Sequence, residues 1–365
     1  MTVNELRANG VWILGCSKAV SSHIYNCTKC RKFRRNTEGQ RMANLPQERT
    51  ELTPPFTYCG MDCFGPIYVK DGRKELKRYG LLLTCMCSRA IHIEMLDDLT
   101  TDAFINALRS FIALRGSVRQ IRCDQGSNFI GARHEFAEAM KEMDGENLKK
   151  IGCEFVMNTP SASHQGGVWE RQIRTVRNVL ASVLDQSAKR LDSSSLRTFL
   201  YEVMAIVNSR PLTTEHLHNP SGPEPLTPNH ILTMKSSIIP PPPGKFIKED
   251  LYLQKRLRRV QFLANSFWER WKKEYLLNLQ SRQKWNRARR NAKVNDIVLL
   301  KDDSAPRSQW KMGRIIDVYL GQDGKVRSVK LLISDSTLDA RGKRTTKPTY
   351  LERPIQKTVT LLEAN

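Results

Sequence analysis

The stretch FTYCGMDCFGPIYV, residues 56–69, decides how this chain folds. It alternates in polarity and is rich in β-forming residues, which predicts a strand. The pair Asp71-Gly72 just beyond it is a hairpin turn signal. Two further strands are expected at RYGLLLTCMCS, 78–88, and AIHIEML, 90–96. The region therefore opens with three consecutive antiparallel strands.

Helices and strands alternate after these three strands. Phe104, Leu108 and Phe111 lie at helical spacing behind Thr100 and Thr101, which are good N-cap residues. The elements expected from here on are a helix over 102–114, a strand over 117–123, a helix within 131–143, a strand over 153–158 and helices over 164–185 and 195–210. This order predicts an α/β domain with a mixed sheet and flanking helices. It is also the order of the ribonuclease-H-like fold.

Three carboxylates occupy places that such a fold brings together. Asp62 lies midway along the first strand, Asp124 at the end of the fourth strand, and Glu170 in the first turns of a late helix. Each has an ordinary alternative: a solvated strand residue, an Asx-turn or helix-cap residue, and a first-turn acid favoured by the helix dipole. Taken together, they predict a site for Mg²⁺ or Mn²⁺, which prefer oxygen ligands. Two such ions about 3.5–4 Å apart support in-line phosphoryl transfer.

The charge of the chain points to a polyanionic partner. Its 59 Lys and Arg against 37 Asp and Glu give a formal net charge of +22. Nucleic acid and an anionic membrane are the two obvious partners, but no apolar run is long enough to cross a bilayer. The odd count of nine cysteines and the absence of a secretion signal at the start argue against a disulfide framework. A reducing compartment, cytosol or nucleus, is therefore expected.

Basic residues gather around two helices. Arg174 and Arg177 follow Glu170 at +4 and +7 on one helical face, an arrangement suited to a DNA phosphate, although Glu170 and Arg174 also suit an intrahelical salt bridge. Residues 245–295 hold fifteen Lys and Arg against four Asp and Glu. A basic helix is expected there, packed through a stripe made of Leu263, Phe267 and Trp271. The side chains expected to contact DNA are Arg171, Arg174, Arg177, Arg287, Arg289 and Arg290.

The chain divides into five segments. They are a basic segment over 1–50 with a CxxC half-site for zinc, a ribonuclease-H-like core over 51–215, a linker over 216–247 containing IIPPPPGKF, a basic helical segment over 248–290 and a small β-barrel over 291–365. In the last segment, short strands surround a Gly-Gln-Asp-Gly turn.

The sequence resembles the integrases of BEL/Pao-type LTR retrotransposons. The matching stretches are FTYCGMDCFGPIYV, IRCDQGSNFIGA, TPSASHQGGVWERQIRTVR, YEVMAIVNSRPLT and EPLTPNHIL. The resemblance implies a D,D,E catalytic triad of Asp62, Asp124 and Glu170 with two divalent ions. It also implies 3′-end processing and strand transfer of element DNA into host DNA. Joining two DNA ends calls for a multimer, and such an enzyme is expected to work in the nucleus after assembly in the cytoplasm.

The first segment of the chain matches this family's zinc module only in part, whereas the last segment resembles a module of the family. Cys27 and Cys30 match the second half of the family's His–His…Cys–Cys zinc module, but the His pair is absent. We expect the chain to begin inside that module; the alternative is a ligand set completed by Cys16 and His23. The last segment resembles the family's SH3-like or chromodomain-like module. Trp310 and Arg314 of this segment are expected to contact DNA or a partner. The alternative for Trp310 is a place in the core.

Two other functions compete with an integrase. A catalytically idle, element-derived nucleic-acid-binding protein would show the same charge and the same folds. A ribonuclease of the same fold would explain neither the CxxC motif nor the basic carboxy-terminal half.

Overall fold

The computed structural model divides the chain into two compact units, Met1–Pro46 and Gln47–Asn365. It describes residues 2–28, 47–123, 153–157, 167–185, 191–213, 225–235, 242–253, 255–279, 290–302, 305–333 and 348–364. The described part of the first unit, residues 2–28, consists of the helices α1 (Thr2–Ala8) and α2 (Cys16–Asn26) and their connection. Cys16 is buried, and the guanidinium of Arg7 lies 4.9 Å from the centre of the Trp12 ring.

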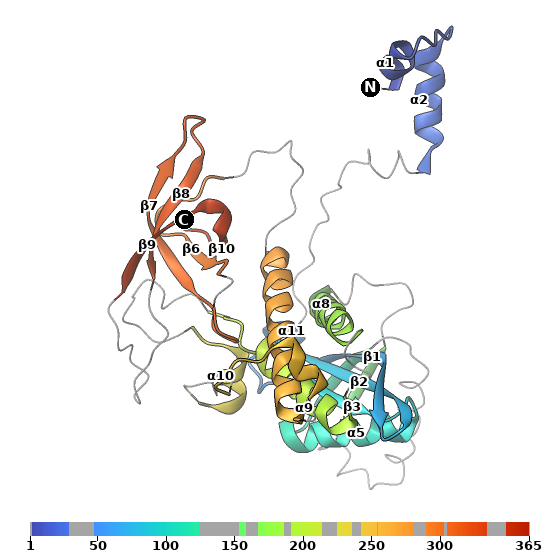
Figure 1. Ribbon diagram of the computed structural model, residues 1–365, viewed down its shortest axis with the longest axis vertical. Helices are drawn as coiled ribbons and strands as arrows, with labels where there is room; N and C mark the ends of the chain where they lie inside the picture. The colour runs from blue at the N-terminus through green and yellow to red at the C-terminus, as the bar shows by residue number, and fades with distance from the viewer. Residues whose placement is uncertain are drawn as a thin grey trace. The chain divides into compact units, whose positions relative to one another are not determined.

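A five-stranded sheet forms the centre of the second unit (Figure 1). Its strands are β1 (Tyr58–Asp71), β2 (Lys74–Cys85), β3 (Ile91–Leu96), β4 (Gln120–Cys123) and β5 (Glu154–Met157). Their spatial order is β3-β2-β1-β4-β5; β1, β2 and β3 pair antiparallel, whereas β4 runs parallel to β1 and β5 parallel to β4. The predicted mixed sheet is confirmed, and its strand order is that of the ribonuclease-H-like fold.

One face of this sheet is covered by α5 (Thr101–Arg115). The side chain of Thr100 caps it by accepting a hydrogen bond from the backbone N–H of Ala103, and Gly116, with φ of 91°, ends it. As the spacing predicts, Phe104, Leu108 and Phe111 are buried, together with strand residues such as Cys59, Met61 and Leu83. Local sequence thus fixes both the extent of this helix and the face that it buries.

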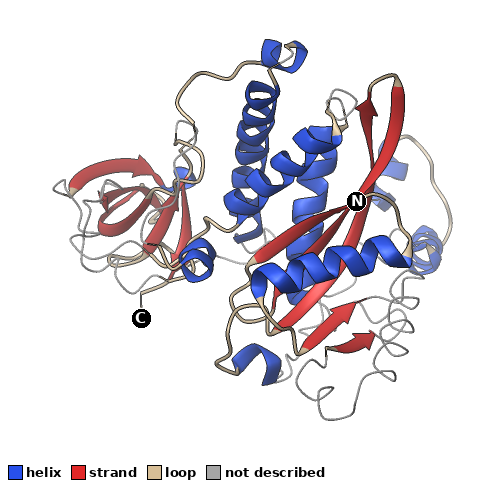
Figure 2. Cartoon of the chain, turned by 90° about the horizontal axis from the view of Figure 1, so that it is seen from below, coloured by secondary structure: helices blue, strands red, loops and turns tan. Residues whose placement is uncertain are grey.

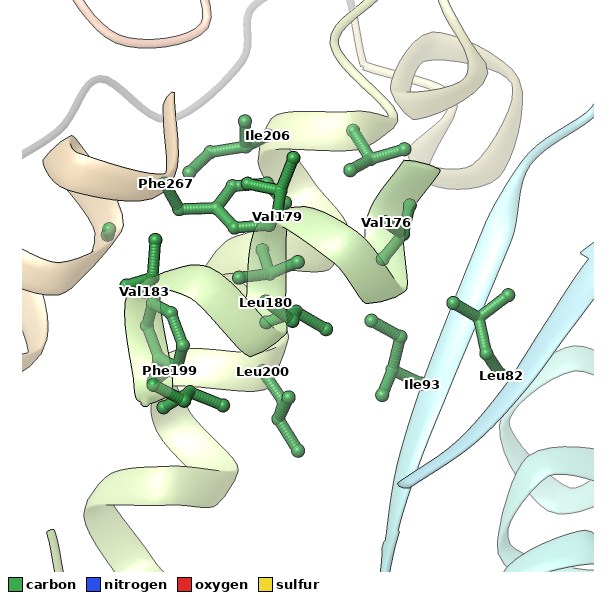
Figure 3. Close-up of a cluster of buried hydrophobic side chains, with 14 of the residues drawn as sticks. Leu82, Ile93, Val176, Val179, Leu180, Val183, Phe199, Leu200, Ile206 and Phe267 are labelled. Carbon is green, nitrogen blue, oxygen red and sulfur yellow. The ribbon is translucent and has the colours of Figure 1, made fainter. Parts of the chain in front are cut away.

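Three helices cover the opposite face, so that the sheet is sandwiched between helices (Figure 2). They are α8 (Gly167–Leu184), α9 (Ser193–Val207) and α11 (Arg256–Leu279). Figure 3 shows Leu82 and Ile93 of the sheet beside Val176 and Leu180 of α8, with Phe267 of α11 in the same cluster. Burying an aliphatic or aromatic side chain of this size contributes about 1.5–3 kcal/mol.

The expected stripe Leu263, Phe267 and Trp271 is buried in this cluster. α11 therefore packs on the same side of the sheet as α8 and α9. Two short helices complete the connections, α10 (Pro228–Thr233) and the 3₁₀ helix η3 (Lys248–Tyr252), and a short α4 (Gln47–Thr50) precedes β1. None of the described helices has the length and apolar composition needed to cross a membrane.

The last segment forms a second five-stranded sheet. Its strands are β6 (Ile297–Leu300), β7 (Met312–Leu320), β8 (Val326–Ile333), β9 (Thr349–Pro354) and β10 (Thr358–Leu362), with the 3₁₀ helix η4 (Ile355–Lys357) between the last two. The order is β10-β6-β7-β8-β9, all antiparallel, and the Gly-Gln-Asp-Gly turn joins β7 to β8. Among the described strands no pairing joins β9 to β10, so they form a sheet rather than a closed barrel.

Candidate active site

Asp62 lies on β1 and faces α8. It pairs across the sheet with Leu82, whose side chain belongs to the core cluster under α8. One carboxylate oxygen, Oδ2, lies 2.6 Å from Nη1 of Arg177 on α8. The side chain of Asp62 is 30% exposed and that of Arg177 is 46% exposed. The ion pair therefore stands at the edge of the hydrophobic core, where solvent or a ligand can reach it.

The neighbouring thiol is unsuited to nucleophilic chemistry. Burial, with the negative charge of Asp62 as a second cause, raises the pKa of Cys63 to about 12. A neutral thiol is a poor nucleophile and a poor metal ligand. The chemistry of this part of β1 therefore belongs to the carboxylate.

The described part of β4 ends one residue before Asp124. Gly60 on β1 pairs with Arg122 on β4 in the parallel register, and β4 extends to Cys123. Asp62 lies two residues beyond Gly60, and Asp124 follows Arg122 by two residues in the sequence. Asp124 itself lies outside the described residues.

Glu170 is the fourth residue of α8. Its backbone is helical, and its side chain lies outside the described part of the structure. Arg171, Arg174 and Arg177 are all exposed on this helix. Arg174 and Arg177 follow position 170 at +4 and +7 along the helix, and Arg177 contacts Asp62.

A metal site is not formed by the described residues alone: within them, no three His, Cys, Asp or Glu side chains lie close enough to share an ion. Of the three predicted acids, only Asp62 has a described side chain. Its character fits a hard divalent cation, because it offers oxygen ligands at a partly open position. Arg177 supplies the balancing positive charge there.

The predicted zinc ligands are only partly described. Cys27 caps the end of α2, where its backbone N–H donates to the carbonyl of His23, and Cys30 lies outside the described residues. Cys16 begins the same continuous helix. Cys16 and His23 stand seven positions apart on this helix, about 10 Å along its axis. The alternative ligand set that includes them stays a prediction.

Arg290 has structural partners. It donates to both carboxylate oxygens of Asp296, at 2.8 and 3.1 Å, and to the carbonyl of Ala364 at 2.9 Å. Burial alone would raise the pKa of Asp296, but hydrogen bonds from Arg290 and from the backbone N–H groups of Lys293 and Ala364 outweigh it and lower that pKa. Arg287 and Arg289 lie outside the described ranges. DNA contact by any of the six arginines stays a prediction.

Trp310 packs as a core residue. Its ring lies 4.9 Å from that of Trp268 and 5.2 Å from that of Tyr275, measured between ring centres, and its Nε1–H donates to the hydroxyl of Ser209 at 3.4 Å. These contacts join the second sheet to α11 and to the end of α9. They favour the core alternative over direct contact with DNA. Arg314, on β7, is half-buried.

Sequence reasoning missed a group of side chains that brace α8. Gln172 of α8 and Arg210, just after α9, both donate to the backbone carbonyl of Arg89. Asn208 brackets the start of β3, since its amide accepts from the N–H of Ile91 at 2.8 Å and donates to the Ile91 carbonyl at 2.9 Å. The motif NSRPLT contains two of these residues, but no local pattern shows what they contact.

Comparisons with known proteins give limited matches. Residues 255–361 match a family model described as a family of unknown function, DUF5641. No curated protein matches the chain. Among solved structures, the chain is similar to one from the simian T-cell lymphotropic virus intasome in complex with the PP2A regulatory subunit B56 gamma. That match has 14% identity and a TM-score of 0.37, and covers 98% of this chain and 94% of the other.

A second similar structure is the catalytic core domain of BIV integrase. It has 16% identity and a TM-score of 0.33, and the match covers 49% of this chain and 95% of the other. At these scores the fold assignment rests on the strand order, the parallel pairing of β1 with β4 and the helices on both faces of the sheet. By these features the second unit has a ribonuclease-H-like core.

Proposed function

We propose that this protein is a retrotransposon integrase of the BEL/Pao type, a metal-dependent polynucleotidyl transferase that processes and joins DNA 3′ ends. Asp62, Asp124 and Glu170 would hold two Mg²⁺ or Mn²⁺ ions. The observation that carries the proposal is the contact between Asp62 on β1 and Arg177 on α8. It joins the strand that bears the first acid to the helix that bears the third.

The register of the sheet supports the pairing of Asp62 with Asp124. In parallel strands, paired residues point to the same side of the sheet, and neighbouring strands lie about 4.8 Å apart. The pair Gly60–Arg122 is described. Asp62 and Asp124 each stand two residues beyond this pair in the sequence, which supports a site shared by the two acids.

The direction in which helical side chains lean supports the proposed role of Glu170 as the third metal-binding acid. Side chains on a helix lean toward its amino terminus. The head group of Arg177 therefore lies toward the amino-terminal half of α8, the half that carries Glu170. Since that head group contacts Asp62, the first acid lies against the helix that carries the third.

The three acids have oxygen ligands of the kind that Mg²⁺ and Mn²⁺ prefer. When bound, two such ions activate the attacking hydroxyl and stabilise the leaving oxygen of a phosphodiester. In the chain itself, Arg177 neutralises Asp62 in the absence of DNA and is free to turn to a phosphate when the carboxylate is engaged. Arg171 and Arg174 extend the basic surface along α8 toward the DNA backbone. The net charge of +22 adds attraction for DNA over the whole chain.

Several further properties belong to the same proposal. The protein works as a multimer, because two DNA ends have to be joined in one event. Its partners are element DNA and target DNA, and its place of action is the nucleus. Cys27 and Cys30 would belong to a zinc module.

A second candidate function is an idle nucleic-acid-binding protein derived from such an element. The short Asp62–Arg177 ion pair favours it, because a carboxylate held by a permanent cation needs no metal. In this case the basic residues would still bind DNA, and no joining would occur.

A strand-transfer assay separates the two functions. The substrate is a duplex with the terminal repeat ends, with Mg²⁺ or Mn²⁺ present, and DNA binding is measured in parallel by fluorescence anisotropy. Asp62→Asn, Asp124→Asn and Glu170→Gln should each abolish joining and retain binding. Asp102→Asn, an exposed acid on α5 across the sheet, is the matched control and should join normally. Binding without joining by the wild-type chain supports the idle protein.

A further inference from the structure

The backbone carbonyl of Arg89 is a shared acceptor between two distant parts of the chain. Nε2 of Gln172 donates to it at 3.1 Å, and Nη2 of Arg210 donates to it as well. Gln172 follows Glu170 by two residues in the first turns of α8. Arg210 comes three residues after the end of α9. The first turns of α8 and the exit from α9 are thus tied to one atom.

That atom is held in a fixed place. Arg89 lies in the turn between β2 and β3 and has φ of 55°, in the left-handed region. Its N–H donates to the carbonyl of Cys85 at 3.0 Å, and the N–H of Met86 donates to the carbonyl of Tyr58 at 2.9 Å. Tyr58 begins β1, the strand that bears Asp62. The Arg89 carbonyl is therefore fixed relative to Asp62 through the sheet.

Arg210 is buried to an unusual degree for its charge. It is 4% exposed, and its Nη1 donates to the carbonyl of Val207 at 2.8 Å. Burial lowers the pKa of Arg210 to about 10. A buried cation is costly unless its donors are satisfied, and in the described part of the chain the hydrogen bonds of Arg210 go to backbone carbonyls. The planar guanidinium reaches its two acceptors from two separate nitrogens in a fixed fork, whereas the donors of a lysine all radiate from one nitrogen.

We propose that Arg210 is a positioning residue for the reaction, acting through the Arg89 carbonyl and Gln172 on the first turns of α8. In this role it fixes the helix segment that carries Glu170 at a set distance from Asp62. The inference rests on the proposed function. Asn208 supports the proposal, because its amide group hydrogen-bonds to the backbone of Ile91 at the start of β3. The segment after α9, which contains Asn208 and Arg210, thus holds the turn between β2 and β3 in place, and that turn contacts α8.

The test uses Gln172→Leu, Arg210→Lys and the double variant in the full chain. Joining is measured over DNA concentration, and hydrogen exchange is followed in the first turns of α8. Each single variant should lose roughly tenfold in the rate at saturating DNA, because a small misplacement of a catalytic group is costly. The DNA concentration for half-saturation should stay within about twofold, and amides of the first turns of α8 should exchange faster. The double variant should be no slower than Arg210→Lys, because both side chains act through one carbonyl.

Lys272→Met is the matched control. Lys272 is also a buried cation, 5% exposed, and donates to a backbone carbonyl, that of Asp302, at 2.6 Å. Its loss should lower the melting temperature and leave the rate per folded molecule unchanged. Gln172 is half-buried, so its variant should fold even where Arg210→Lys does not.

Two results overturn the inference. One is a normal rate in Gln172→Leu with normal exchange in α8, and the other is a pair of independent losses that multiply in the double variant. Failure of the proposed function looks different: the wild-type chain would then bind DNA without joining it, or Asp62→Asn would join as well as the wild type. If Asp62→Asn is inactive and Gln172→Leu joins DNA normally, the proposed integrase function is supported and the positioning role of Arg210 is refuted.

Discussion

Replacing Phe267 by alanine should destabilise the ribonuclease-H-like core, although this residue lies far along the chain from the candidate acids. Phe267 is fully buried on α11 and packs in the cluster that contains Val176 of α8 and Leu200 of α9 (Figure 3). Truncating a buried phenylalanine costs about 3–5 kcal/mol, because transfer free energy is lost and a cavity remains. For a core of this size, each kcal/mol shifts the melting temperature by about 2–4 °C. The expected drop is therefore about 6–20 °C.

The measurement is thermal unfolding of the full chain, with hydrogen exchange to show which elements open. Leu257→Ala on the same helix is the control, because Leu257 is 59% exposed and its loss should shift the melting temperature by little. In Phe267→Ala, amides of α8 and α9 should lose protection together with those of α11. The reasoning is refuted if the two variants melt alike, or if α11 opens while α8 and α9 stay protected.

Further predictions concern the second sheet, the site and the charge. Asp296→Ala should destabilise the second sheet by about 3 kcal/mol, since it leaves Arg290 and two backbone N–H groups without their carboxylate; thermal unfolding measures this loss. Because the folded-state pKa of Asp296 is lowered, its contribution is present above the unfolded pKa of about 4 and is lost as pH falls through the folded value; wild-type stability in acid should therefore fall more steeply than that of the variant. Cys63 should resist alkylation at pH 8 because its pKa is raised to about 12, and Asp62→Asn should speed the reaction by removing a charge that raises this pKa; mass spectrometry reads both rates. Chelating divalent metal with EDTA should stop joining and leave DNA binding in place. Arg177→Ala should reduce the salt dependence of DNA binding by about one phosphate contact. Anisotropy titrations over a salt series measure this dependence, and an unchanged slope of log affinity against log salt concentration would show that the contact is absent.

Patterns that repeat along the sequence predicted most of the core fold. Strand alternation around Asp62 and helical spacing of Phe104, Leu108 and Phe111 depend on local geometry, so they can be recognised without knowledge of distant contacts. The helical spacing was confirmed by burial. The predicted strand is present as β1, but core clusters cover both of its faces, so its burial does not alternate around Asp62. The stripe on α11 predicted a packed face in the same way. What that face packs against depends on tertiary structure, and only the coordinates show α8 and α9 as its partners.

The site was less predictable than the fold. Arg177 was expected on the face of Glu170, but its contact with Asp62 spans 115 residues and leaves no local trace. Arg210 escaped prediction for another reason: its acceptor is a backbone carbonyl 121 residues away, and a carbonyl has no residue type to recognise. Sequence patterns show which chemical groups are present, and distant backbone atoms stay hidden from them.

The left-handed turn residue at position 89 bears on how this protein can change during evolution. What α8 and Arg210 need there is a main-chain oxygen, which every amino acid possesses, in a conformation that only some adopt easily. The side chain at this position is therefore free to drift among glycine, asparagine and aspartate, while β-branched residues are selected against. In a family alignment such a site would show no invariant letter, and a search for conserved residues would pass over it.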